Sequence, residues 1–220
     1  MSDTPEKLRA RRKIIQHAIW PIVGIVIAFG WKYPLLGFSV PVVMLMGVVG
    51  GIIQGRYVCG HLCPRGGFFD RIIAPMSRKR PIPTFFRNRA LRWTLFIFLM
   101  AFMIYRISLN PTDIEHWGKV FWLMCAVTTA IGIILGIFIH PRAWCSFCPM
   151  GTMQSALDRD NKQLQIDSRK CIECRKCEKV CPMNLAIVKF KSEGRLPDHD
   201  CLKCPECSAI CPRHALTWQL

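Results

Sequence analysis

Four long apolar stretches in the first 140 residues most strongly constrain how this chain can fold. They cover residues 14–29, 35–53, 91–109 and 120–139. Each comes close to the roughly 20 residues that a helix needs to cross a bilayer. Buried core helices are the alternative, but the first 140 residues hold too little polar sequence to cover four of them. We therefore predict four transmembrane helices, and hence a multi-pass membrane protein.

The basic residues predict the orientation of these helices. Residues 7–13 hold five Lys or Arg, and residues 56–92 hold nine. The first loop on the other side has only Lys32, and the second includes Asp113 and Glu115. Because cytoplasmic loops are rich in Lys and Arg, we expect the N-terminus, residues 56–92 and everything after the fourth span to be cytoplasmic. The net charge of +16 then faces anionic lipid in the cytoplasmic (inner) membrane, and we expect no nucleic-acid partner.

A cysteine–proline motif recurs after the second and the fourth apolar stretch. The first copy is Cys59-x3-Cys63-Pro64, and the second is Cys145-x2-Cys148-Pro149. This recurrence predicts two parallel helix-pair repeats within an α-helical membrane domain, residues 1–157. A small α+β module, residues 158–220, follows, and its residues 158–167 are expected to form a polar linker.

The last third of the chain carries two runs of four cysteines, each closed by a proline. They are Cys171-x2-Cys174-x2-Cys177-x3-Cys181-Pro182 and Cys201-x2-Cys204-x2-Cys207-x3-Cys211-Pro212. This spacing is typical of bacterial two-cluster ferredoxins, in which the fourth cysteine of each run ligates the other [4Fe–4S] cluster. We predict one cluster on Cys171, Cys174, Cys177 and Cys211, and a second on Cys201, Cys204, Cys207 and Cys181.

Zinc and disulfides explain these eight cysteines less well. Four-cysteine zinc sites usually use two CxxC pairs separated by a spacer. Disulfides are rare in the reducing compartment where we place this module. Basic residues beside the cysteines could raise the cluster potentials, dock an acidic partner or simply form a solvated surface. These residues are Lys170, Arg175, Lys176, Lys179 and Lys203.

Cys59, Cys63, Cys145 and Cys148 form a second candidate set. Four thiols gathered at one membrane face suit a third cluster or another metal such as copper, because soft thiolates favour both. Thiol–disulfide redox pairs and the border of a quinone pocket are further roles that the sequence leaves open, with His61 as an extra ligand or proton carrier. The structural alternative is a pair of helix-ending turns with buried thiols. Two matched copies favour a functional role.

Other residues in or near the spans carry weaker signals. His17 and His140 are candidates for proton exchange near a quinone headgroup. Cys125 is expected to be an inert apolar residue, and Arg92 and Arg106 are expected to snorkel to the membrane surfaces. Aromatic residues are expected in interfacial belts: Trp20, Trp31, Tyr33, Trp93, Tyr105, Trp117 and Trp144. No pattern typical of a catalytic site stands out, so we assign no catalytic residue.

The four spans, the Cys–Pro motifs and the double cysteine run together resemble a known family. They are similar to the membrane-bound quinol-dehydrogenase ferredoxins of periplasmic nitrate reductase systems. Relatives of that family include nitrous-oxide reductase maturation polyferredoxins and copper-handling accessory proteins of cbb3-type oxidase assembly. The distinguishing residues are Cys59-Gly-His-Leu-Cys-Pro64 and Trp144-Cys-Ser-Phe-Cys-Pro149, and the resemblance covers nearly the whole chain.

The resemblance implies a part in electron transport, as in anaerobic respiration. The chain would be a quinol-oxidising subunit that passes electrons from membrane quinol through [4Fe–4S] clusters to a redox partner. That partner would be another ferredoxin, a cytochrome or a reductase subunit. The alternative function is an assembly factor that binds or reduces copper for a respiratory metalloenzyme. In a third interpretation the helices only anchor a ferredoxin.

Overall fold

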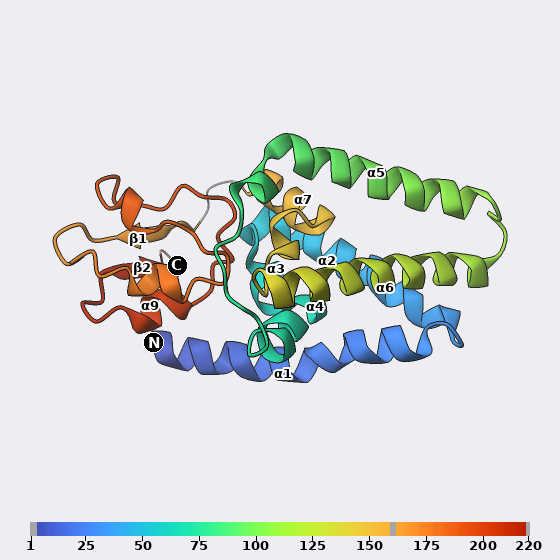
Figure 1. Cartoon of the computed structure of the whole chain (residues 1–220), viewed down its shortest axis with the longest axis horizontal. Helices are drawn as coiled ribbons and strands as arrows, with labels where there is room; N and C mark the ends of the chain where they lie inside the picture. Colours follow the sequence, from blue (N-terminus) through green and yellow to red (C-terminus); the bar gives the residue numbers. More distant parts are fainter. Residues whose placement is uncertain (1–3, 159–161, 219–220) are drawn as a thin grey trace.

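The structure, a computed structural model, describes residues 4–158 and 162–218 and is mostly helical. Four long helices run side by side for part of their length, and a small module lies at one end of them (Figure 1). The helices are α1 (Pro5–Phe29), α2 (Ser39–Gln54, preceded by the 3₁₀ turn η1, Pro34–Phe38), α5 (Arg89–Ser108) and α6 (Ile114–Phe138). All four are long and apolar enough to cross a membrane, which confirms the four predicted spans in length and composition.

The ends of these helices follow from local sequence. Pro5 opens α1, because proline lacks only an N–H that would be unpaired there anyway. The side chains of Asn88 and Asp113 cap α5 and α6 by accepting hydrogen bonds from the amides of Ala90 and Glu115. Helix α1 begins well before residue 14, where its apolar stretch starts, because its polar first turns pack against α9 of the C-terminal module.

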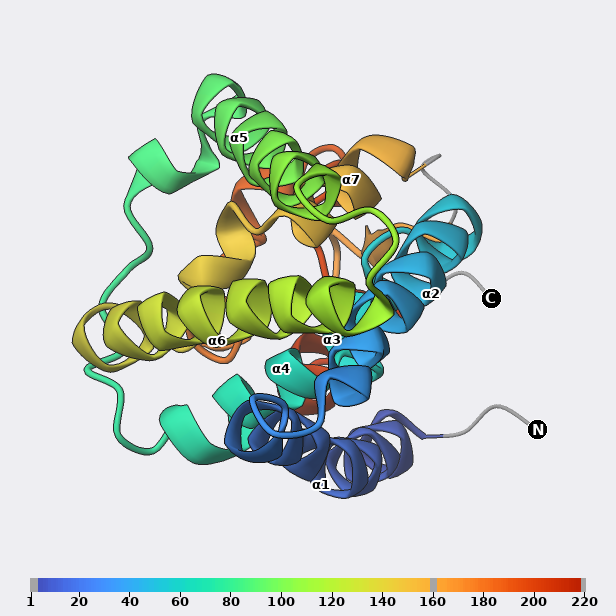
Figure 2. The same ribbon diagram turned by 90° about the vertical axis from the view of Figure 1, so that its right-hand side faces the viewer.

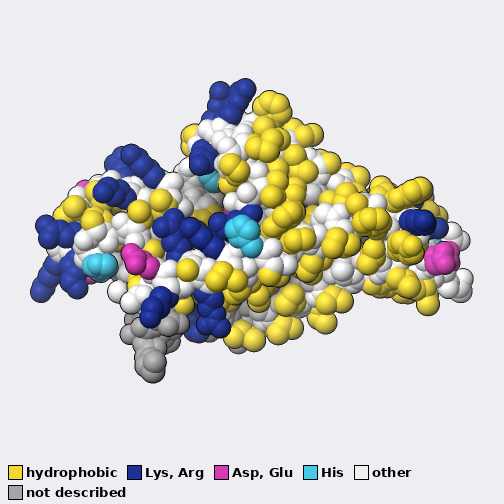
Figure 3. All heavy atoms as spheres, turned by 90° about the horizontal axis from the view of Figure 1, so that it is seen from below, with side chains coloured by type: hydrophobic (Ala, Val, Ile, Leu, Met, Phe, Trp, Pro, Cys, Tyr) yellow, Lys and Arg dark blue, Asp and Glu magenta, His cyan; other side chains and the backbone are white. Residues whose placement is uncertain are grey.

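Apolar side chains cover the outside of the helical part. Leu45 on α2 is 67% exposed, Phe98 on α5 is 63% exposed and Ile134 on α6 is 57% exposed. In a space-filling view, hydrophobic side chains spread over the helical part while Lys and Arg gather over the module and at its junction with the helices (Figure 3). Contiguous apolar surface of this extent indicates contact with lipid.

Short elements fill the space between the long helices on the side of the module. They are α3 (Tyr57–His61), α4 (Pro64–Phe68), the π-helical turn η2 (Phe69–Ile73), η3 (Thr84–Arg87), η4 (Trp144–Ser146) and α7 (Pro149–Leu157). The view along the long helices shows α3 and α4 between α1 and α6, and α7 between α5 and α2 (Figure 2). Pro64 and Pro149 each occupy the first helical position of α4 and α7. Each Cys–Pro motif therefore starts a short helix that packs among the spans.

The C-terminal module is built on a two-stranded antiparallel sheet. Strand β1 (Leu164–Ile166) pairs with β2 (Leu216–Trp218) in the register Leu164↔Trp218 and Ile166↔Leu216. Three short helices, α8 (Lys176–Lys179), η5 (Val188–Phe190) and α9 (Glu206–Ile210), complete the module. Leu164 and Ile166 are almost fully buried in its core together with Met183, Leu185 and Leu202. Residues that follow each of the two cysteine runs or lie within them therefore share one core.

The fold corrects the predicted linker and the predicted position of Arg92. The predicted linker 158–167 contains β1, because Leu164 and Ile166 are core residues. Residues 159–161 of that linker, and residues 1–3 and 219–220 of the two predicted domains, lie outside the described residues. Arg92 does not snorkel to a membrane surface. It is 7% exposed and forms a bidentate ion pair with Asp200 of the module.

Candidate functional site

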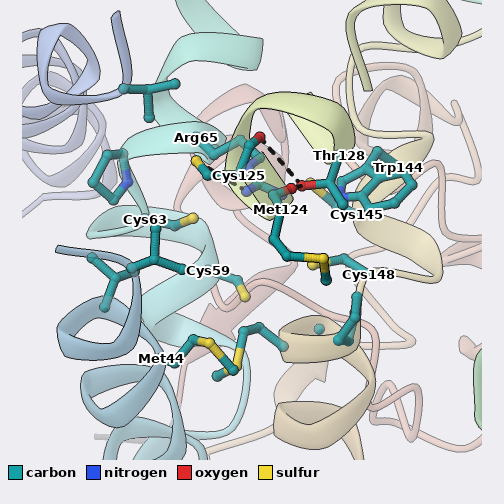
Figure 4. A pocket seen from close by; sticks show the side chains of 18 of the residues that line it. Met44, Cys59, Cys63, Arg65, Met124, Cys125, Thr128, Trp144, Cys145 and Cys148 are labelled. Atoms are coloured by element: carbon teal, nitrogen blue, oxygen red, sulfur yellow. Dashed lines mark hydrogen bonds between the residues drawn. The ribbon is translucent and has the colours of Figure 1, made fainter. Parts of the chain in front are cut away.

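A cavity lies between the long helices, beside the two Cys–Pro motifs. We call it the membrane cavity; its volume is about 170 Å³. All four predicted cysteines, Cys59, Cys63, Cys145 and Cys148, line it, and Figure 4 shows their side chains around a common space. An apolar cavity of about 150 Å³ can hold a benzene ring, so this one can admit the ring of an organic molecule. Its remaining wall is apolar, from residues such as Ile22, Val26 and Leu99.

Sulfur is unusually abundant in this wall. Cys125, which the sequence predicts to be inert, lines the cavity too, and Nη2 of Arg65 donates to its Sγ at 3.5 Å. Five of the ten methionines of the chain also line the cavity: Met44, Met100, Met103, Met124 and Met150. Methionine is a common filler of irregular apolar space, but a thioether is also a ligand for soft metals.

Two buried arginines cross between the Cys–Pro motifs. Arg142 precedes the second motif, yet its Nη1 donates to the carbonyl of Cys59 in the first, at 3.0 Å. Arg56 precedes the first motif, and its Nη2 donates to the carbonyl of Cys145 in the second, at 2.6 Å. Both line the membrane cavity and are at most 1% exposed. The two motifs are thereby tied to each other by reciprocal contacts.

Glycine is required beside each of these guanidinium groups. A Cβ on Gly66 would lie 2.7 Å from Nη1 of Arg142, and one on Gly151 would lie 2.5 Å from Nη2 of Arg56. Gly66 and Gly151 each lie two residues after the proline of their motif. In each motif, therefore, the glycine after the proline lies against the arginine that precedes the other motif.

Asp70 balances the charge of Arg142. Nε and Nη2 of Arg142 donate to its two carboxylate oxygens at 2.8 and 2.7 Å, and Arg12 of α1 donates to it at 2.6 Å. Burial alone would raise the pKa of Asp70, but the guanidinium groups outweigh it and hold that pKa well below the usual range. Asp70 is therefore an anion at neutral pH, fixed between α1 and the second motif.

The thiols face the opposite electrostatic conditions. Burial raises the pKa of Cys59, and the nearby Arg56 offsets only part of this effect. Burial raises the pKa of Cys145 as well, and here Arg142 opposes it, with its Nη1 3.7 Å from the sulfur. A metal that displaces the thiol protons would therefore be bound by cysteine thiolates, and each thiolate would lie next to a guanidinium group.

The eight cysteines of the C-terminal module line two further cavities. One, which we call the outer ferredoxin cavity, is lined by Cys171, Cys174, Cys177 and Cys211. The other, the inner ferredoxin cavity, is lined by Cys181, Cys201, Cys204 and Cys207. The structure thus brings together the same two sets of four that the spacing predicts, each combining three cysteines of one run with the last of the other.

The donor sets suit iron–sulfur clusters better than single ions. Within residues 4–158 and 162–218, no three Cys, His, Asp or Glu side chains approach closely enough to hold one metal ion. A tetrahedral zinc site needs sulfurs only about 3.8 Å apart, given Zn–S bonds of about 2.3 Å. A cubane spreads its four thiolates more widely, because each binds a different iron. Burial raises the pKa of Cys204 to about 11, so ligation would displace a proton that the free thiol keeps.

The helical part and the inner ferredoxin cavity are in direct contact. Cys59 and Cys145 pack against the module core that contains Cys204 and Cys207. A Cβ on Gly60 would lie 2.5 Å from the carbonyl oxygen of Leu202, so Gly60 allows the turn between Cys59 and Cys63 to approach the module closely. The membrane cavity and the inner ferredoxin cavity therefore share the Cys59–Cys145 region as a common boundary.

Ion pairs between the helical part and the module hold the two in this position, among them one between Nε of Arg9 and Glu206 at 2.7 Å. Nη1 of Arg12 donates to Glu206 at 2.8 Å, and Arg56 and Arg92 both donate to Asp200 at 2.8 Å. Lys203 pairs at 3.0 Å with Asp158, the residue that caps the C-terminal end of α7, so Lys203 lies at the junction and not on a docking surface. Arg87 adds hydrogen bonds to the carbonyls of Met183 and Asn184.

The candidate histidines do not reach the membrane cavity. His17 is exposed on α1 with its Nδ1 near the carbonyl of Lys13. His61 stacks on Tyr57, with ring centroids 3.9 Å apart. Burial lowers the pKa of His61 and of His140 to about 4, so both are neutral at pH 7. Trp144 lies 3% exposed in the cavity wall, which corrects its assignment to an interfacial belt.

The sequence reasoning missed the polar residues that organise the site. Arg56 and Arg92 contribute to the predicted orientation only as two of the basic residues of 56–92, and Arg142, Asp70 and Asp200 are not singled out by the sequence pattern. The sequence does carry a signal for Arg56 and Arg142, because each arginine lies three residues before the first cysteine of its Cys–Pro motif. The partners Asp70 and Asp200 lie far away in sequence and carry no local signal.

Two families of iron–sulfur domain match this chain. A 4Fe–4S binding domain matches residues 36–83 and 120–164, which contain both Cys–Pro motifs. A 4Fe–4S dicluster domain matches residues 170–216, which contain the eight cysteines of the module. No solved structure matches the chain.

Several proteins are distantly similar over most of the chain. The uncharacterized protein MJ0749 of Methanocaldococcus jannaschii is 25% identical over 205 residues, which cover 86% of this chain and 80% of that protein. The methylamine utilization ferredoxin-type protein MauN of Paracoccus denitrificans is 26% identical over 75% of this chain. The putative electron transport protein YccM of Escherichia coli is 24% identical over 77% of it.

The last two relatives are longer than the region of similarity. The alignments span 61% of MauN and 54% of YccM, which is less than two thirds of either protein. Cavities, cysteine sets and family matches agree on the nature of the domains. The chain carries 4Fe–4S ferredoxin domains and is a distant homologue of MauN and YccM.

Proposed function

We propose that this protein passes electrons between the membrane quinol pool and a redox partner through [4Fe–4S] clusters. One observation carries the proposal: Cys59 and Cys145 line the membrane cavity and pack against the module core, whose two ferredoxin cavities share Ile187 in their walls. The names of MauN, a ferredoxin-type protein, and YccM, a putative electron transport protein, support the same function.

The cysteines divide into three ligand sets in this proposal. Cys171, Cys174, Cys177 and Cys211 hold one cluster in the outer ferredoxin cavity, and Cys181, Cys201, Cys204 and Cys207 hold another in the inner one. Cys59, Cys63, Cys145 and Cys148 hold a third, because the 4Fe–4S binding domain match covers both of their motifs and because Arg56, Arg65 and Arg142 line the same cavity and offset thiolate charge. When bound, such clusters accept and donate single electrons.

Quinol is the substrate that suits the membrane cavity. The cavity opens among apolar side chains of the spans, where a lipid-soluble molecule can enter, and it ends at the four cysteines. Oxidation of quinol to quinone releases two protons and two electrons, so two one-electron acceptors are needed. The indole N–H of the buried Trp144 has no hydrogen-bond partner among the described residues, and it is available to a quinone oxygen.

The architecture of the membrane domain completes the proposal. We infer that residues 1–157 are two parallel helix-pair repeats, supported by the reciprocal Arg56 and Arg142 contacts. The module would extend from residue 158 to 220. The N-terminus and the module face the cytoplasm, supported by the Lys and Arg content of residues 7–13 and 56–92.

Metal and sulfide analysis of anaerobically purified protein tests the ligand sets. Three clusters predict about twelve irons per chain, since each cluster holds four. The double variant Cys59→Ser/Cys148→Ser should lose about four of them and keep the ferredoxin signals. Wild-type protein with about eight irons, unchanged in the double variant, would exclude the third cluster.

A copper-handling assembly factor is the second candidate function. The five methionine thioethers around the membrane cavity favour it, because thioether and thiolate together select Cu(I). This function predicts about eight irons and one tightly bound Cu(I), lost in Cys59→Ser/Cys148→Ser and weakened in Met100→Leu/Met103→Leu. Copper-free protein that still responds to quinol would exclude it.

A further inference from the structure

The two ferredoxin cavities differ sharply in their surroundings. Within the described residues, the inner cavity is lined only by cysteines and by apolar side chains such as Leu164, Met183 and Leu202. The outer cavity has four cationic side chains in its wall, Lys170, Arg175, Lys176 and Arg213. Its one acidic residue, Glu173, is paired with Lys191 at 2.8 Å, and Lys170 is paired with Asp167 at 3.3 Å, which leaves Arg175, Lys176 and Arg213 in excess. The outer cavity therefore has a net positive rim, and the inner one has an apolar sheath.

The outer cavity is also the one that solvent reaches. Cys174 is exposed, and the adjacent Ile172 is 58% exposed. All residues that line this cavity come from the C-terminal module, and none of the junction contacts involves them. In Figure 1 the chain that follows β1 loops around the end of the module away from the long helices. This end therefore points away from the membrane that the spans occupy.

We propose that this end is a docking surface for an acidic redox protein. The inference rests on the proposed function, and it assigns the outer ferredoxin cavity as the exchange point with the partner and the inner one as the internal step. An exposed apolar residue, Ile172, surrounded by cations matches the usual anatomy of an interface, with an apolar centre and a polar rim. Complementary charge steers such encounters and raises association rates 10- to 1,000-fold at low salt.

An anionic membrane is the other surface that a cationic rim could bind. The position of the rim argues against it, because the junction contacts fix the module with this end opposite the spans. A protein partner meets no such obstacle. The cationic side chains and the exposed Cys174 both lie at the end of the module that faces away from the spans.

Binding of the acidic electron carrier flavodoxin to the purified protein in uncharged nanodiscs tests the proposal. We expect an affinity that falls at least tenfold between roughly 10 mM and 150 mM salt, as the Debye length shrinks from about 30 Å to about 8 Å. The basic carrier cytochrome c should not bind. Zero-length cross-linking should join flavodoxin carboxylates to Lys170 or Lys176.

A matched pair of variants separates local from general charge effects. Lys170→Gln/Arg175→Gln/Lys176→Gln/Arg213→Gln should weaken flavodoxin binding about tenfold or more and slow its reduction by dithionite-reduced protein to the same extent. Arg78→Gln/Lys79→Gln/Arg80→Gln/Arg89→Gln removes the same charge from exposed sites on the helical part and should change binding less than twofold.

Equal loss in both variants would overturn the proposal, as would binding only to phosphatidylglycerol vesicles. Dithionite replaces quinol here, so this outcome is independent of whether quinol is the substrate.

Discussion

At the scale of single residues, buried charge shapes this molecule more than its apolar composition suggests. Asp70 accepts from Arg142 and Arg12, and Gln16 donates to it at 2.9 Å. Removing one partner from such a network leaves uncompensated charge in a place that water does not reach. The carboxylate of Asp70 therefore sets the position of both guanidinium groups.

The substitution Asp70→Asn should destabilise the helical part by about 3–5 kcal/mol at pH 7. It leaves Arg142 and Arg12 buried without their counter-ion. Loss of folded protein on heating, followed by size-exclusion chromatography in detergent, measures the effect. Glu173→Gln is the matched control, since Glu173 is 59% exposed in a surface ion pair and should leave the midpoint unchanged. An equal midpoint for both variants would contradict this account.

The pH dependence of the same variant follows from the depressed pKa of Asp70. A lowered pKa contributes stability that is present above the unfolded value of about 3.9 and is lost as the pH falls toward the folded value. The difference between wild type and Asp70→Asn should therefore be constant from pH 6 to 8 and shrink below about pH 4. A difference that grew in acid would show that another group dominates.

At the scale of elements, close contact between helices depends on glycine. Gly37 in η1 and Gly118 in α6 face each other so closely that a Cβ on Gly118 would overlap the carbonyl of Pro34. Small residues of this kind let membrane helices approach, because packing replaces the hydrophobic effect inside lipid. This contact fixes the entry of α2 against α6 and hence one wall of the membrane cavity.

Gly118→Ala should lower thermal stability by about 1–3 kcal/mol, because the added methyl group forces η1 and α6 apart. Gly24→Ala is the control, since a Cβ there meets nothing within 4 Å. Thermal unfolding of both variants in detergent checks the expectation. Similar losses in the two would mean that helix flexibility, not the η1–α6 contact, is responsible.

At the scale of the whole molecule, the module and the N-terminal turns of α1 must lie on one side of the membrane, since Arg12 pairs with Glu206. We expect that side to be the cytoplasm. Green fluorescent protein fused after Leu220 should fluoresce, and alkaline phosphatase fused there should be inactive. Phosphatase inserted after Asn110 should be active. An active C-terminal phosphatase would invert the orientation.

The sequence predicts features that depend on neighbouring residues, and it does not predict features that depend on contacts between distant parts of the chain. Apolar stretches and cysteine spacing are local, so the four helices and the two sets of module cysteines could be predicted. Arg92 and Trp144 were misplaced because hydropathy places a polar or aromatic residue at a membrane surface unless a partner is known. Their partners and surroundings, Asp200 for Arg92 and Phe147 for Trp144, depend on how the module and the Cys–Pro turns pack. The methionine-rich wall likewise arises from four elements, α2, α5, α6 and α7, that only the fold brings together.

The central claim is that electrons from quinol reach the module by way of the Cys–Pro cysteines. Its most direct test is the EPR spectrum of oxidised, anaerobic protein after addition of menadiol, a soluble menaquinol analogue. We predict that menadiol reduces the clusters of wild-type protein but not those of Cys59→Ser/Cys148→Ser, while dithionite reduces the module clusters of both. Equal reduction by menadiol in the variant and the wild type would contradict the claim and leave the helices as an anchor.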